Sequence, residues 1–121
     1  MARLGTVGVA LAITALALSG CGVGGAVTQA RAACVHVKAA LAIQAQSEAK
    51  GLTAARRSQL QTKALTELIK ATPLAAAATT ADGTWNPLQT TLQEANRVPL
   101  QLEAPALTRL CQIANSSTPI L

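Results

Sequence analysis

Residues 27–41 read VTQARAACVHVKAAL and have the period of an α-helix. Apolar side chains recur there at alternating spacings of three and four residues, which places them on one side of a helix. The positions are Val27, Ala30, Cys34, Val37 and Leu41. Because such a stripe turns toward the core of a folded domain, this stretch predicts the first helix of an all-α protein.

The same spacing returns near the other end of the chain. The second stripe consists of Leu100, Ala104, Leu107, Cys111 and Ala114. Cys34 lies near the start of the first predicted helix and Cys111 near the end of the last, and these ends meet in an up-down-up-down bundle. We therefore predict a disulfide between Cys34 and Cys111. The alternatives are two free buried thiols or a metal site.

Two further helices are expected between these stripes. Gly51 predicts the end of the first helix, and Thr53 is a suitable N-cap for the second. The second helix has a broad apolar face made of Leu60, Ala64, Leu65, Leu68 and Ile69. Pro73 predicts an interruption, because proline lacks a backbone N–H and clashes with the preceding helical turn.

The remaining chain leaves two structural alternatives open. The alanine-rich residues 75–78 suit either a close-packed helix or a loose connection. Asn86 is the expected N-cap of a third helix, with Pro87 at its first position. The stripe of this helix is Leu88, Leu92 and Ala95. The last helix begins either at Pro99 or at Pro105.

The expected core contains few large side chains. The chain has one Trp and neither Phe nor Tyr, so Leu, Ala, Ile and Val supply the core. Alanine buries little apolar surface, and each Å² contributes only about 25 cal/mol. A small domain of this composition benefits from a covalent cross-link. We expect Trp85 to fill space between the helices, the alternative being a stacking or membrane-interface residue.

Charge divides unevenly along the chain. Residues 31–70 hold seven cations and two carboxylates, a net +5, whereas residues 71–121 hold two cations and three carboxylates, a net −1. The basic part is either an ordinary solvated helix face or a surface for anionic headgroups and wall polymers. Arg56-Arg57 is a pair rather than a run, so no nucleic-acid partner is predicted.

No pattern in the sequence predicts catalysis, a metal site or a cofactor. His36 is the only histidine. On a helix its side chain points about 200° away from Cys34, so these two residues cannot share a metal ion. The five carboxylates are scattered, and no serine lies in a glycine-rich elbow. We expect a protein that is not an enzyme, with His36 at its surface.

The first 21 residues have the order of an export signal. Arg3 precedes a short apolar run at 7–18, which leads into Leu18-Ser19-Gly20-Cys21. This order resembles the signal peptide and lipobox of bacterial lipoproteins. The resemblance implies a diacylglyceryl group on the Cys21 thiol and cleavage between Gly20 and Cys21. An uncleaved anchor is the weaker alternative, because about twelve apolar residues fall short of the ~20 that span a bilayer. An ordinary secretory signal with an incidental cysteine is another.

Together these patterns predict a small bundle of about four helices, closed by one disulfide, after a cleaved signal peptide. The expected division is a lipoprotein signal peptide at 1–20, a lipidated tether at 21–26, the bundle at 27–115 and a flexible tail at 116–121. The expected location is the extracytoplasmic side of the cell membrane, reached through the lipid anchor.

Three functions agree with this organisation. The first is a non-catalytic binding or interaction module for an unknown envelope protein. The second is a carrier of a lipid or another small apolar ligand. The third is a surface-exclusion lipoprotein encoded by a phage or plasmid. An enclosed, dry cavity would favour the carrier, whereas a tight core with an exposed apolar patch would favour the interaction module.

Overall fold

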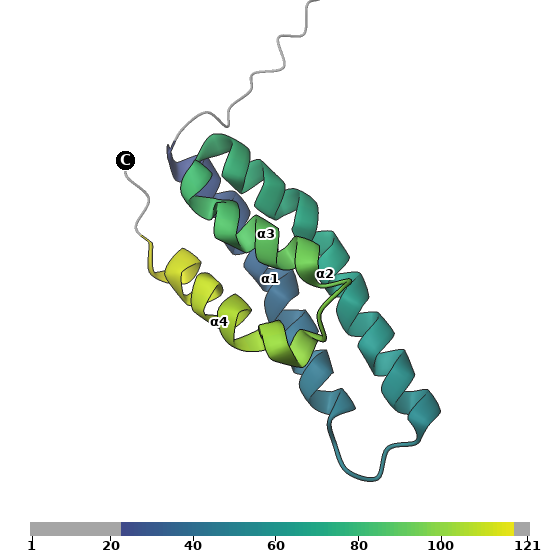
Figure 1. Cartoon of the computed structure of the whole chain (residues 1–121). Helices are drawn as coiled ribbons and strands as arrows, with labels where there is room; N and C mark the ends of the chain where they lie inside the picture. Colours follow the sequence, from purple (N-terminus) through teal and green to yellow (C-terminus); the bar gives the residue numbers. More distant parts are fainter. Residues whose placement is uncertain (1–22, 118–121) are drawn as a thin grey trace, which may run out of the picture.

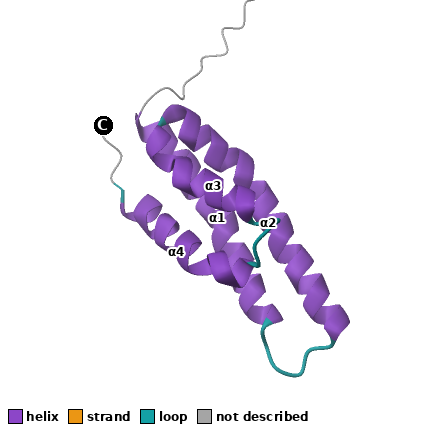
Figure 2. Ribbon diagram, in the orientation of Figure 1, coloured by secondary structure: helices purple, strands orange, loops and turns teal. Residues whose placement is uncertain are grey.

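The computed structural model describes residues 23–117, which form a helical bundle (Figures 1 and 2). The helices are α1 (Val23–Ser47), α2 (Ala54–Ala81), α3 (Asn86–Glu94) and α4 (Leu100–Ser116), with a short 3-10 helix, η1 (Gly83–Trp85), before α3. No strand occurs within this range. The predicted all-α architecture of four helices is confirmed. None of the helices in the described range is long and apolar enough to span a membrane.

The long α1–α2 hairpin forms one side of the molecule, and the shorter α3 and α4 cover part of it (Figure 1). Helix α1 has its largest contact with α2 and a second contact with α4, while α3 packs against α2 and α4. The chain therefore runs up and down around a closed bundle. At the α1–α2 connection the hairpin projects beyond α3 and α4 (Figure 1).

Alanine dominates the interior of the two long helices. On each of them, four buried alanines are at most 1% exposed: Ala26, Ala30, Ala33 and Ala40 on α1, and Ala64, Ala71, Ala75 and Ala78 on α2. Small side chains let helix backbones approach closely, and dispersion contacts grow with that approach. Residues 75–78 are thus close-packed helix, which decides the alternative that their composition left open.

Larger side chains fill the space where η1, α3 and α4 close the bundle. Leu68, Leu88 and Leu107 are at most 1% exposed, and Trp85 is 6% exposed. Trp85 belongs to the hydrophobic core, so its expected role as a space-filling residue is confirmed. No hydrogen-bond acceptor among the described residues reaches its indole Nε1.

The predicted interruption at Pro73 is wrong, because α2 continues through this residue to Ala81. Proline at 73 removes the N–H that would bind the carbonyl of Ile69. Pro73 lies on the exposed side of the helix, where water can hydrate that carbonyl. The buried alanines on either side, Ala71 and Ala75, hold the helix against α1. The Ile69 side chain is 58% exposed, which corrects its expected place on the apolar face.

Helix ends account for the other differences. Thr53 caps α2 as predicted, since its hydroxyl accepts a hydrogen bond from the backbone N–H of Arg56 at 3.1 Å. Asn86 is already helical, and Trp85 occupies the cap position of α3 without a side-chain bond. Helix α4 starts at Leu100 with Pro99 as its cap, and Pro105 lies inside it on the exposed side.

The boundaries of the predicted domain also shift slightly. Helix α1 starts at Val23, so residues 23–26, expected in the tether, belong to the helix. It ends at Ser47, and Gly51 adopts a φ of +85° in the loop that follows. This left-handed conformation favours glycine. Ser116 ends α4 rather than starting the tail. The expected signal peptide, Gly20, Cys21 and residues 118–121 lie outside the described range.

Candidate functional site

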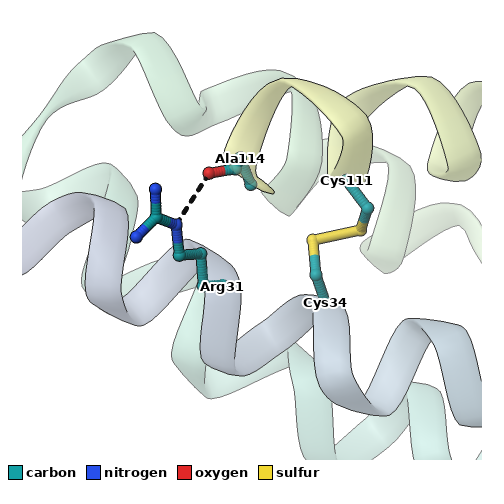
Figure 3. Close-up of a disulfide and its surroundings, with 4 residues drawn as sticks. All are labelled: Arg31, Cys34, Cys111 and Ala114. Carbon is teal, nitrogen blue, oxygen red and sulfur yellow. Dashed lines mark hydrogen bonds between the residues drawn. A yellow bond between two sulfur atoms is a disulfide. The ribbon is translucent and has the colours of Figure 1, made fainter. Parts of the chain in front are cut away.

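The two predicted cysteines meet in a disulfide that joins α1 to α4 (Figure 3). The Cα atoms of Cys34 and Cys111 are 5.5 Å apart, and the residues are 4% and 9% exposed. The bridge links positions 77 residues apart in the chain. The predicted pairing is confirmed, and the first and last helices are held together near the N-terminal half of α1.

One helical turn from the disulfide, Arg31 forms a second link between the same helices. Its Nε donates a hydrogen bond to the backbone carbonyl of Ala114 at 2.9 Å (Figure 3), and its Nη2 donates to the carbonyl of Ser117. The last carbonyls of a helix lack intrahelical partners and carry a partial negative charge. Arg31 therefore caps the C-terminus of α4, a role that local sequence patterns do not reveal.

His36 and Glu67 connect α1 to α2. His36 Nδ1 lies 2.8 Å from Glu67 Oε2, and Lys70 Nζ donates to Glu67 Oε1 at 3.0 Å. The hydrogen bond from His36, and then that from Lys70, hold the pKa of Glu67 below its ordinary value. His36 is half-buried rather than a plain surface residue. In the described range, no group of three His, Cys, Asp or Glu side chains could hold a metal ion.

Glu103 is the carboxylate that sequence patterns placed least well. It lies in the first turn of α4, is only 7% exposed, and its Oε2 has no hydrogen-bond partner among the described residues. Burial, followed by the nearby charge of Glu94, raises the pKa of Glu103. The inward stripe of α4 includes Glu103, whereas Ala104, expected on it, is half-buried. Glu103 lies four residues before Leu107, a spacing that fits the inward stripe of the helix. Its charge nevertheless argues against a buried position, so the sequence did not predict one.

These two carboxylates predict opposite responses to pH. The lowered pKa of Glu67 means that its ionised form stabilises the fold; this contribution is lost as pH falls below about 5. The raised pKa of Glu103 means that its ionised form destabilises the fold, so this penalty grows as pH rises above about 5. We expect Glu67→Gln to lower the free energy of unfolding at pH 7, and Glu103→Gln to raise it.

Urea denaturation between pH 3 and pH 8 checks both signs. The difference in the free energy of unfolding between each variant and the wild-type protein should shrink as pH falls, because all the carboxyl groups become protonated. Glu48, which is exposed, offers a control in Glu48→Gln. Differences that stay constant over the whole pH range would contradict the assignments of Glu67 and Glu103.

Open grooves lie between the helices. One of about 340 Å³ lies between α1, α2, the α3–α4 connection and the start of α4. Two others, of about 550 Å³ and 290 Å³, lie between α1 and α4. The last two share Leu41, Thr108 and Gln112 and thus form a continuous α1–α4 groove that reaches the disulfide. Their open shape suits contact with another molecule's surface better than enclosure of a small ligand.

Several large apolar side chains face solvent. Val35 on α1 is 67% exposed, and Leu102 and Ile113 on α4 are 70% and 49% exposed. Leu102 and Ile113 are eleven positions apart, which is close to three helical turns, so both lie on one side of α4. Single exposed apolar residues are common on protein surfaces, and these residues alone do not identify a partner.

The fold and the bridge define the chain as a small all-α protein closed by a disulfide. Comparisons with protein-family models, curated proteins and solved structures found no match. The function is therefore inferred from the residues of this chain.

Proposed function

We propose that this chain is a lipid-anchored protein of the bacterial cell envelope and that its bundle is a non-catalytic binding module. The observation that carries the proposal is the use of the three cysteines. Two of them, Cys34 and Cys111, pair with each other. The third, Cys21, stands where the lipobox resemblance implies a lipid. Disulfides persist in oxidising compartments, which agrees with export from the cytoplasm.

The position of Cys21 in the chain suggests how the module would be held. Cys21 lies two residues before α1, which begins at Val23. A lipid on this residue would attach the membrane to the end of the bundle where α1 begins and α4 ends. Two acyl chains give stable anchoring, whereas one gives only reversible binding. The α1–α2 connection would lie about 37 Å further along α1, estimated from 1.5 Å per residue.

The main polar side chains of the bundle connect helices to one another, which supports a binding module rather than an enzyme. Arg31 caps α4, and Glu67 binds His36 and Lys70. Arg57 Nε donates to the carbonyl of Ser47, which joins the second helix to the end of the first. Each of these groups holds two helices together. The open grooves between the helices provide surfaces for a partner.

Fatty-acid labelling in the bacterial host tests the anchor. An alkyne-bearing palmitate analogue should be incorporated into the wild-type protein, and Cys21→Ser should abolish labelling and leave the precursor uncut. The double variant Cys34→Ser/Cys111→Ser keeps Cys21 and is the matched control, because it should still be labelled. Labelling that survives Cys21→Ser would contradict the proposal.

A further inference from the structure

We propose that the outer edge of α2 binds a linear polyanion that carries phosphate groups. We define the basic edge as Arg56, Lys63 and Lys70 on α2, together with Lys50 and Arg57 at the tip of the hairpin. This inference deepens the proposed function, since it names a partner for the binding module. It rests on the binding role, and only the choice of a polymer over the bilayer also uses the lipid anchor at Cys21.

Three of these cations form a row along one side of α2. Arg56, Lys63 and Lys70 are spaced by seven residues, and a heptad returns to the same helix side within about 20°. All three are exposed. At 1.5 Å per residue, neighbours are about 10 Å apart and the row extends about 21 Å. This spacing exceeds the reach of one phosphate, so the row suits a chain of anionic groups.

Most of these cations have no carboxylate partner within residues 23–117. The ion pairs there join Glu67 to His36 and Lys70, and Glu94 to Arg97. Lys50, Arg56 and Lys63 are therefore available to an external anion. Arg57 is also oriented, because its Nε donates to the Ser47 carbonyl at 3.1 Å. A guanidinium held in this way presents its remaining donors in a fixed plane, which matches the geometry of phosphate.

Most of the acidic groups lie elsewhere on the molecule. Asp82, Glu94 and Glu103 belong to η1, α3 and α4 or their ends, whereas Glu48 lies in the α1–α2 connection near Lys50. Glu67 lies within the row and Glu48 at the tip of the hairpin, so five cations and two carboxylates give this region a net charge of +3. This excess, placed on the hairpin that projects beyond α3 and α4, attracts a polyanion by releasing its counterions.

The row suits a polymer better than the bilayer that would hold Cys21. The tip of the hairpin, with Lys50, Arg56 and Arg57, lies at the opposite end of α1 from Val23. A bundle anchored through its N-terminus and standing away from the membrane would present this end to polymers of the envelope.

The test uses the full chain with its disulfide intact, extracted in a non-ionic detergent, and inorganic polyphosphate as the probe. Binding is measured by fluorescence anisotropy in a salt series from 50 mM to 300 mM. We expect Arg56→Gln/Lys63→Gln to weaken binding at low salt by about tenfold or more. The slope of the logarithm of the binding constant against the logarithm of the salt concentration should become shallower by about 1.4, because each lost phosphate contact contributes ~0.7. Lys38→Gln/Arg109→Gln removes an identical charge from α1 and α4 and is the matched control.

Three results would overturn the inference. They are absence of polyphosphate binding, equal losses in the two double variants, and binding only to phosphatidylglycerol vesicles, which would assign the edge to a membrane instead. Glu67→Gln should strengthen binding, because it removes the one carboxylate in the row. The palmitate label on Cys21 separates the two proposals: an unlabelled protein that binds polyphosphate contradicts the anchor alone, and a labelled protein that does not bind contradicts the polyanion alone.

Discussion

Replacing Cys34 and Cys111 with serine should lower the free energy of unfolding by about 4–5 kcal/mol, the value expected for a bridge that closes a loop of 77 residues. The bridge restricts the unfolded chain and also fastens α4 to α1. Native domains have only about 5–15 kcal/mol of stability in total. With a core made largely of alanine, we expect much of the double variant to be unfolded at 37 °C.

Circular dichroism during heating measures this effect. Adding a reductant to the wild-type protein should lower its melting temperature to that of the double variant, which reductant should leave unchanged. Equal melting temperatures for the oxidised wild type and the double variant would contradict a stabilising bridge.

Replacing Trp85 with alanine should cost about 3–5 kcal/mol, the usual range for deletion of a large buried aromatic side chain. Trp85 is the only aromatic residue of the core and is 6% exposed. The neighbouring residues of η1 and α3 are tied to short helices, so the bundle cannot close fully over the cavity. The loss includes both transferred surface and the cavity that remains.

Trp85→Phe is the informative companion to this change. Phenylalanine keeps most of the apolar volume and removes an indole N–H that has no partner in the described range. An unpaired buried donor costs about 1–3 kcal/mol, which offsets part of the lost packing. Guanidinium denaturation followed by circular dichroism should therefore place the phenylalanine variant much closer to wild type than the alanine variant. Equal losses of stability in the phenylalanine and alanine variants would contradict the space-filling role of Trp85.

Local periodicity predicted the features that depend on helix geometry. Cys34 and Cys111 each lie on a stripe with spacings of three and four, and such stripes face the core in any bundle. Their pairing followed from the positions of the two stripes at opposite ends of the chain. Thr53 was predicted as a cap for the same reason, because capping involves only the first helical turn.

Features that depend on contacts between helices were not predictable in this way. A proline inside a helix usually interrupts it, but the exposed position of Pro73 and the alanine contacts beside it keep α2 continuous. Glu103 is buried because the packing of α4 turns that position inward. The caps and bridges made by Arg31 and Glu67 join residues from different helices. Single-segment patterns contain no information on such pairs.

The most direct test of the account is the intact mass of the protein extracted from bacterial membranes, after alkylation without reduction. We predict a chain that begins at Cys21, carries a diacylglyceryl group and contains no alkylated cysteine, because Cys34 and Cys111 are paired and Cys21 holds the lipid. A chain without fatty acyl groups, or one alkylated at Cys34 and Cys111, would contradict the account.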